Sequence, residues 1–438
     1  MLSKLKIEKL LLLKSHSGLR AIVANTGWLF ADRILRMGAG LIVGVWIARY
    51  LGVQQYGLFN YAAAFVVLFS PLATLGLDNL VVRNIVHDSS GKEQILGTTF
   101  WLKLFGGVGS LLLAVAFISV FRQNDNLTIT LVAIFAAGGI FQAFDTIDFW
   151  FQSQVQSKYT VIAKNTAFAI ITLVKVILLN MQAPLIAFAW AALAEIGLSA
   201  MGLVLVYKIK GNSLYLWRWS FPIAKTLLKE SWPLILSGVT ILIYLKIDQI
   251  MLGEMVGDSA VGIYSAAARI SEIWYFIPAA IVSSVSPAIF SAKQSSEELY
   301  YQHIKRLMRL MVVIAIAIAL PMSFLSGTII TLLFGDGYAA AGQVLTIHIW
   351  ASLFYFVGLA ASPWFVSENL THLSLRRSLM GAIINVILNL LLIPRYIGVG
   401  AAIATVISYA VGSVLANATH PKTRKIFKIQ MRSILMLN

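Results

Sequence analysis

Charged residues inside otherwise apolar stretches are the side chains of this sequence best placed to do chemistry. A lysine or arginine at bilayer depth can bind an anionic group, and a carboxylate there can pair with a cation or exchange a proton. Each charge near the middle of a bilayer costs about 2.5 to 3.5 kcal/mol, so we expect these side chains to face water or one another. They are Asp32, Arg33, Arg36, Arg49, Lys103, Asp145, Asp148, Lys164, Lys175 and Glu195, followed by Lys246, Asp248, Arg269 and Glu272.

The signs of these charges are unevenly distributed along the chain. In the amino-terminal part, six basic residues stand against four acidic ones, whereas the carboxyl-terminal part has two of each. This excess of positive charge suits an anionic ligand. Lys246 and Asp248 are two residues apart on one predicted helix, so they point to different sides and need partners on other helices.

Helical spacing predicts partners for some of these charges. Residues three or four positions apart lie on one helix face, so we expect pairs between Asp32 and Arg36 and between Arg269 and Glu272. Both pairs could serve structure alone.

Two further charges near the end of the predicted fourth helix suggest an interhelical contact. Asp145 and Asp148 share a face, and Lys103 lies at a comparable depth on the preceding helix, which predicts an ion pair between the two helices. Lys164 and Arg49 lie near the ends of their stretches, and we expect Lys164 to extend its amine toward the headgroups.

The composition requires a membrane to hold these residues. Hydrophobic residues make up 59% of the 438, charged residues 12%, and the mean hydropathy is +0.83. Windows of about 20 apolar residues, the length that crosses a bilayer, predict an all-α integral membrane protein of about twelve helices. These lie near residues 26–49, 57–77, 95–121, 127–149, 159–180, 184–207, 232–253, 261–290, 310–334, 340–366, 378–393 and 397–418.

The positions of lysine and arginine predict the orientation of these helices. Of the 34 basic residues, 24 fall in the tails and in alternate loops, whereas only Arg122 and Arg395 fall on the opposite side. By the positive-inside rule, both termini are expected in the cytoplasm. The formal charge of +16 is therefore interpreted as contact with anionic membrane lipids rather than with nucleic acid.

A repeated motif predicts that the chain is a duplication. Residues 51–65 (LGVQQYGLFNYAAAF) and 256–270 (VGDSAVGIYSAAARI) align with Gly52 on Gly257 and Gly57 on Gly262. We expect two pseudo-symmetric six-helix bundles around a central cavity, as in transporters built from repeats. The predicted bundles are residues 1–210 and 231–438, each with a basic tail, joined by an interfacial linker at residues 211–230.

Prolines occupy similar places in the two predicted bundles. Pro71 falls in the second predicted helix, and Pro278 and Pro287 fall in the eighth. Proline removes a backbone donor and bends a helix, so matching interruptions suggest gates; a fixed kink is the alternative for each.

Several kinds of chemistry lack the residues they need. The sequence has no cysteine, and its six histidines show no metal-ligand spacing, so we predict no metal site. The phosphate-binding pattern GxxxxGK[ST] is absent as well, which argues against nucleotide-driven transport.

Taken together, LGVQQYGLFNYAAAF, LATLGLDNLVVRNI (residues 72–85), KIDQIMLG (246–253) and VGIYSAAARISE (261–272) resemble the polysaccharide-transporter, or O-antigen flippase (Wzx-type), family of the multidrug/oligosaccharidyl-lipid/polysaccharide (MOP) exporter superfamily. The resemblance implies a two-lobed, twelve-helix flippase and no enzyme. Its cargo would be an undecaprenyl-pyrophosphate-linked oligosaccharide, moved from the inner to the outer leaflet of the bacterial plasma membrane. It further implies that polysaccharide polymerase and glycosyltransferases are functional partners.

The resemblance also implies roles for individual residues. Cations of the lumen would bind the anionic cargo, the candidates being Arg33, Arg36, Arg49, Lys103, Lys175, Lys246 and Arg269. Asp248, Glu195, Asp32 and Glu272 are the candidates for H⁺ or Na⁺ coupling or for counter-ions. Asp78 and Arg83 match the cytoplasmic edge of the second helix.

Two other functions remain open from the residues alone. A multidrug or small-cation exporter of the same superfamily would favour acidic or aromatic walls, which the excess of basic residues opposes. A membrane polymerase or ligase acting on lipid-linked glycans would be expected to use a large outer loop, and the predicted outer loops are short.

Overall fold

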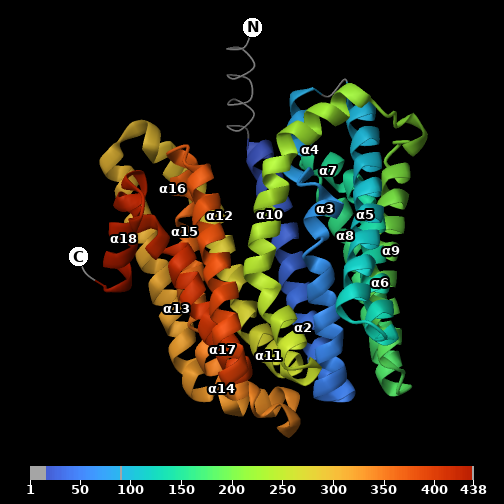
Figure 1. The fold of residues 1–438 in the computed structure, drawn as a ribbon. Helices are drawn as coiled ribbons and strands as arrows, with labels where there is room; N and C mark the ends of the chain where they lie inside the picture. Colours follow the sequence, from blue (N-terminus) through green and yellow to red (C-terminus); the bar gives the residue numbers. More distant parts are fainter. Residues whose placement is uncertain (1–15, 89–90, 437–438) are drawn as a thin grey trace. The chain divides into compact units, whose positions relative to one another are not determined.

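The protein is helical in every regular element that the computed structural model describes, which covers residues 16–88 and 91–436, with side chains from residue 35 onward. The helices, labelled in Figure 1, are α2 (His16–Val67), α3 (Ser70–Thr74), α4 (Asp78–His87), α5 (Lys92–Phe121), α6 (Asn126–Phe141), α7 (Asp145–Ser153), α8 (Lys158–Asn180), α9 (Leu185–Ile209), α10 (Phe221–Met255), α11 (Asp258–Glu272), α12 (Phe276–Ser295), α13 (Glu297–Phe334), α14 (Ala341–His348), α15 (Ala351–Ala360), α16 (Ser362–Ser367), α17 (Thr371–Ser413) and α18 (Arg424–Ile434). Short 3₁₀ turns join several of them, including η1 (Gln142–Phe144), η2 (Leu214–Leu216), η3 (Ile273–Tyr275) and η4 (Asp336–Tyr338).

Ten helical segments in the described part are long and apolar enough to cross a membrane. Two of them contain a residue with non-helical backbone angles, Gly52 in α2 and Ile397 in α17, where the chain turns. Dividing these two segments gives twelve, in agreement with the predicted all-α membrane class. The chain is a multi-pass membrane protein.

The repeated motif produces the same backbone turn in both copies. Gly52 has φ 70° and ψ 174°, and its counterpart Gly257 has φ 115° and is followed directly by α11. Glycine adopts positive φ readily because it lacks the Cβ that clashes there. The two matching glycines therefore allow a sharp change of direction before each copy's helix.

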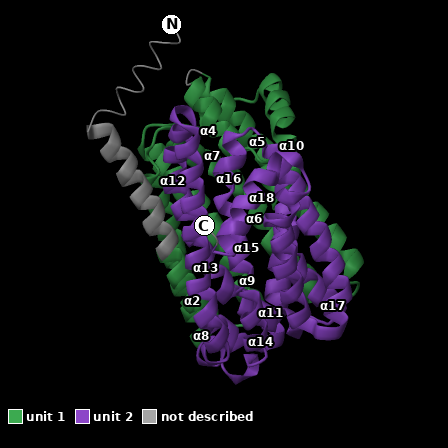
Figure 2. Ribbon diagram, turned by 90° about the vertical axis from the view of Figure 1, so that its left-hand side faces the viewer, with its two compact units in different colours: residues 1–44, 69–236 green, residues 45–68, 237–438 purple. Residues whose placement is uncertain are grey.

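The chain divides into two compact units, coloured separately in Figure 2. Unit 1 comprises residues 1–44 and 69–236, and unit 2 comprises residues 45–68 and 237–438. The division predicted from the sequence kept residues 1–210 together, whereas here the segment 45–68 around the first repeated motif belongs with unit 2.

Unit 1 is built on three helix pairs: α5 packs on α6, α8 on α9, and α6 on α9. One apolar cluster joins α4, α5 and the start of α10 through Val81, Leu96 and Leu227. A second joins α7 to α9 through Phe151 and Leu203. The predicted linker is partly helical, because α10 already begins at Phe221.

Unit 2 has its largest apolar core between α12, α13, α15, α16 and α18. Met308, Met311, Phe356, Trp364 and Ile426 are all buried there. On its other side, α11 packs on α14 and α17, and α14 packs on α17. This second set of helices carries the residues that contact Lys246 and Asp248 of α10.

The prolines differ in how they act on the helices. Pro71 lies in the first turn of α3, after a break between Val67 and Ser70. Pro278 likewise lies near the start of α12, after the 3₁₀ turn η3. The prediction that Pro287 breaks the eighth helix again is wrong, because α12 continues through it from Phe276 to Ser295.

Candidate functional site

Three residues of α2, α8 and α9 form the first charged group of unit 1. The Lys175 amine donates to Glu195 Oε2 at 2.9 Å, and Arg36 Nη1 lies 4.0 Å from Glu195 Oε1. Arg36 Nε also donates to Asn165 Oδ1 at 3.0 Å, and its guanidinium lies 5.2 Å from the centre of the Phe168 ring. Two cations of different helices thus contact one carboxylate.

Lys103 is a second cation of unit 1 and is almost fully buried, with 1% of its side chain exposed. Its amine lies 3.5 Å from Asp78 Oδ1 and 4.6 Å from the centre of the Phe149 ring. Asp78 begins α4 and is 55% exposed. The counter-ion of this buried amine is therefore itself exposed.

The expected partners of Lys103 belong to another lysine. Asp145 and Asp148 both contact the Lys164 amine, at 2.8 and 2.9 Å. The predicted pair between these aspartates and Lys103 is wrong, and Lys164 does not reach away to the headgroups as we expected. Spacing placed the two aspartates on one face of the helix but could not show which neighbouring helix that face meets.

In unit 2, Lys246 of α10 donates to Glu272 Oε2 of α11 at 3.2 Å. Both side chains keep about a quarter of their surface exposed, at 26% and 30%. Glu272 thus has an ion pair with another helix, while its predicted pair with Arg269, three residues away on α11, stays a prediction. Arg269 itself is half-buried on α11.

Asp248, two residues from Lys246, is 2% exposed and has a separate set of partners. Tyr264 donates to its Oδ2 at 2.7 Å, Thr405 donates to the same oxygen at 2.5 Å, and Asn389 Nδ2 donates to Oδ1 at 2.5 Å. No lysine or arginine of the described residues forms an ion pair with it. The carboxylate is thus held by neutral donors alone.

The turn at Ile397 explains why Asn389 and Thr405 meet at Asp248. They lie equally far along the chain from Ile397, so the reversal of α17 places them at one depth. Next to them, Asn389 donates to Asn385 Oδ1 at 3.1 Å, and Asn385 donates to Ser408 at 3.2 Å. The polar residues form one continuous hydrogen-bonded group inside apolar helices.

His348 of α14 lies beside this group and is 2% exposed. Its ring meets the Tyr264 ring edge to face, with the ring centres 5.5 Å apart. The charges of Glu272, Asp248 and Lys246 all act on it. Two acids, one lysine and one histidine of unit 2 are therefore electrostatically linked.

The remaining predicted site residues occupy other positions. Arg49 donates to the carbonyls of Leu332 and Leu333, at 2.5 and 2.6 Å, and so caps the end of α13. Arg83 forms an ion pair with Glu230. Asp32 and Arg33 lie on α2, but their side chains fall outside the described residues, so the predicted Asp32–Arg36 pair stays a prediction.

Sequence reasoning missed the neutral partners of Asp248. We singled out charges, whereas Tyr264, Asn385, Asn389, Thr405 and Ser408 are uncharged. The sequence did contain a sign of this polar group. Asn385 and Asn389 are four residues apart in an apolar helix and so lie on one face.

A multi-pass helical bundle with buried charges and a duplicated motif is the architecture of a membrane transporter. Residues 22–293 match the family described as polysaccharide biosynthesis protein, and residues 233–391 match the MatE family. The chain belongs to the polysaccharide biosynthesis protein family.

Two curated relatives come from Haloferax volcanii. The chain is 26% identical over 393 residues to the probable low-salt glycan biosynthesis flippase Agl15, a match that covers 86% of this chain and 79% of Agl15. It is 32% identical over 185 residues to the probable flippase AglR. The second match covers 41% of this chain and 38% of AglR, so it spans less than half of that relative's length.

Solved structures share the fold at low sequence identity. The lipid II flippase MurJ in an inward closed conformation has a TM-score of 0.70 at 17% identity, covering 94% of this chain and 91% of MurJ. An inward-facing multidrug resistance MATE transporter has a TM-score of 0.70 at 14% identity, covering 89% and 95%. A MOP transporter of Pyrococcus furiosus has a TM-score of 0.60 at 16% identity, covering 94% and 95%.

Proposed function

We propose that this protein carries an undecaprenyl-pyrophosphate-linked oligosaccharide, such as an O-antigen repeat unit, from the inner to the outer leaflet of the plasma membrane. Membership of the polysaccharide biosynthesis protein family and similarity to the probable glycan biosynthesis flippase Agl15 support the class of cargo. The observation that carries the proposal for this chain is the presence of three cations, Arg36, Lys175 and Lys103, on membrane-spanning helices of unit 1. A pyrophosphate is the part of such a lipid that these cations would bind.

When the pyrophosphate binds, it would replace the carboxylate partners of these cations. Arg36 and Lys175 share Glu195, and Lys103 contacts the exposed Asp78, so each cation can turn to a phosphate without leaving a fully buried acid unpaired. Arginine and lysine bind phosphate through charge-assisted hydrogen bonds. The prenyl tail stays in hydrocarbon while the sugars pass by alternating access, and no covalent bond changes.

We further propose that an ion gradient drives the cycle through Asp248. Na⁺ prefers oxygen ligands, as hard cations do, and the side chains of Asp248, Asn385, Asn389 and Thr405 supply them in unit 2. The residues fit a cation because the Asn389 side-chain oxygen is buried and accepts no hydrogen bond from the protein. A bound cation, or a proton on Asp248, would neutralise this carboxylate.

The proposed cargo also predicts the membrane in which the protein lies and its functional partners. We place the protein in the plasma membrane with both termini in the cytoplasm, where 24 of the 34 basic residues are predicted to lie. Its functional partners would be the glycosyltransferases that build the lipid-linked glycan and the polymerase that extends it.

Complementation tests the proposed function. In a bacterial strain that lacks its own O-antigen flippase, the wild-type chain is expected to restore surface glycan. Lys103→Met keeps the length of the side chain and removes its charge, so the restored glycan should fall about tenfold or more, since a hydrogen bond to a charged group contributes about 1.5 to 3 kcal/mol. Membrane abundance should not change.

Lys229→Met is the matched control, because Lys229 is exposed on α10, and its surface glycan should equal that of the wild type. Full activity of Lys103→Met would remove this lysine from the binding site. No restoration by the wild-type chain would contradict the proposed cargo.

The match of residues 233–391 to the MatE family favours multidrug export as the second candidate function. Under that function, the wild-type chain would protect a drug-sensitive strain from ethidium and leave the flippase-deficient strain without surface glycan. We expect the reverse result.

A further inference from the structure

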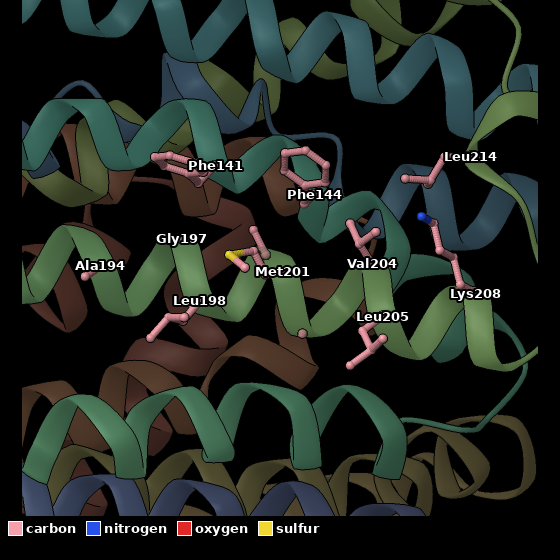
Figure 3. A pocket seen from close by; sticks show the side chains of 12 residues that line it. Phe141, Phe144, Ala194, Gly197, Leu198, Met201, Val204, Leu205, Lys208 and Leu214 are labelled. Atoms are coloured by element: carbon pink, nitrogen blue, oxygen red, sulfur yellow. The ribbon is translucent and has the colours of Figure 1, made fainter.

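One apolar groove in unit 1 lies apart from the charged groups. Figure 3 shows it along α9, facing the region where α6 passes into η1. Its volume is about 940 Å³, and its lining includes Phe141, Phe144, Gly197, Met201, Leu205 and Lys208. A pocket of this size holds a ligand of many carbon atoms.

Small residues on α9 open the groove. Ala194 and Gly197 line it, and Figure 3 shows both on the turns of α9 beneath Phe141. A Cβ atom at Gly197 would meet nothing nearer than the Phe141 ring, at 4.0 Å. The space between the two helices is therefore unfilled by the protein, and a larger side chain at Gly197 would enter it.

The groove is open at its side to the medium around the helices. Met201 and Leu205 are 67% and 59% exposed, although α9 is a membrane-spanning helix. From Ala194 to Lys208 the groove follows α9 for roughly 21 Å, given a rise of about 1.5 Å per residue. This length exceeds half of a hydrocarbon core of about 30 Å, so one lipid chain of a single leaflet fits along it.

A single cation marks one end of this apolar groove. Lys208 is exposed, lies one residue before the end of α9, and extends its amine toward Leu214 in Figure 3. No carboxylate of the described residues forms an ion pair with it. The ring of Trp217, centred 5.8 Å from that of the buried Tyr207, is of the type that lies at headgroup level. An anionic headgroup would supply the missing counter-charge.

We propose that this groove binds one anionic phospholipid, with an acyl chain along α9 and the phosphate on the Lys208 amine. Basic residues at the ends of grooves between membrane helices bind such headgroups. A zwitterionic phospholipid carries its own cation next to the phosphate and would gain less from Lys208. The site is separate from the proposed cargo-binding cations and does not depend on the proposed function.

Photocrosslinking in nanodiscs tests the site with the full chain. The probe is phosphatidylglycerol with a diazirine on one acyl chain, compared with phosphatidylcholine carrying the same chain. Labelled peptides from α9 and from residues 141–144 are expected with phosphatidylglycerol. Lys208→Ala should lower this labelling about fivefold, the effect of one lysine near a membrane surface, and Gly197→Leu should abolish it by filling the groove.

Lys225→Ala is the matched control, because Lys225 is an exposed lysine of α10 outside the groove, and its labelling should equal that of the wild type. Size-exclusion profiles identify any variant that fails to fold. If a variant fails, the site is tested on the wild type instead, by adding unlabelled phosphatidylglycerol to compete with the probe. Equal labelling by both lipids, or labelling unchanged by Lys208→Ala, would overturn the proposal. Displacement by undecaprenyl phosphate but not by phosphatidylglycerol would assign the groove to the carrier lipid and also overturn it.

Discussion

Gly57 and Gly262, which occupy the same position in the two copies of the repeated motif, pack against each other in unit 2. A Cβ atom at Gly57 would lie 1.8 Å from the carbonyl oxygen of Asp258, and one at Gly262 would lie 2.1 Å from that of Val53. The contact is reciprocal, because each glycine meets the backbone at the start of the other copy's helix. Equivalent residues meet in this way when a two-fold axis relates the copies.

This contact predicts a strong penalty for any side chain. Gly57→Ala and Gly262→Ala would each force the helix backbones apart, since no flexible side chain can yield, and overpacking of this kind costs about 1 to 3 kcal/mol or more. We expect a lower apparent melting temperature of the purified protein in detergent. Gly109→Ala is the control, because nothing lies within 4 Å of its Cβ position; equal melting temperatures for all three variants would contradict the contact.

Asp248 is predicted to make the protein's stability depend on the coupling ion. A cation that binds only the native state stabilises it by about 2.7 kcal/mol at a concentration of 100 Kd. Replacing choline by Na⁺ at constant ionic strength should therefore raise the melting temperature of the wild type.

Asp248→Asn removes the charge but keeps an oxygen for the donors around it, so it should abolish this rise. Asp336→Asn, at an exposed acid in η4, should leave the rise intact. A rise of the same size in Asp248→Asn would assign the ion to another site.

Glu195 is predicted to stabilise unit 1 by pairing with Lys175 and Arg36. Glu195→Gln leaves the partly buried Lys175 amine without its carboxylate, at a cost of about 1 to 3 kcal/mol. The double variant Lys175→Met, Glu195→Gln should recover part of this loss, because the unpaired charge is gone. The measurement is a double-mutant cycle on thermal stability.

The exposed pair Lys425–Glu297 serves as the comparison, with side chains 56% and 71% exposed. Its coupling should lie within about 0 to 1 kcal/mol, as for surface pairs generally. Equal coupling in the two pairs would show that Glu195 has no special role.

The stability of the protein is predicted to depend on pH through Asp125, at the start of α6. Burial raises the pKa of Asp125, but hydrogen bonds from the Thr128 side chain and backbone and the charge of Arg122 outweigh burial and hold this pKa below its ordinary value. The contribution to stability is therefore present above the unfolded-state pKa of about 3.9 and is lost as pH falls through the lower folded-state value.

Asp125→Ala should accordingly cost about 1 kcal/mol at pH 7, the usual value of an N-cap, and the difference from the wild type should shrink below about pH 4. Thermal unfolding at pH 7 and at lower pH measures both values. A difference that stays constant with pH would contradict the role of the charged carboxylate.

The sequence by itself determined the all-α membrane class and contained the repeated motif. Long apolar runs have one stable environment, so windows of the right length identify membrane helices without any knowledge of their neighbours. The motif around Gly52 and Gly257 likewise appears as the same turn in both places, because only local backbone freedom is required. The prediction that Lys246 and Asp248 have separate partners followed from spacing alone and agrees with the structure.

The tertiary structure decided which helices face one another, and therefore which charges pair. Lys164, rather than Lys103, meets Asp145 and Asp148, and Glu272 turns to Lys246. Helical periodicity defines a residue's depth and face, whereas its partner depends on packing between segments far apart in the chain. For the same physical reason, only the fold shows that Asn389 and Thr405 meet at Asp248 and that Gly57 meets Gly262.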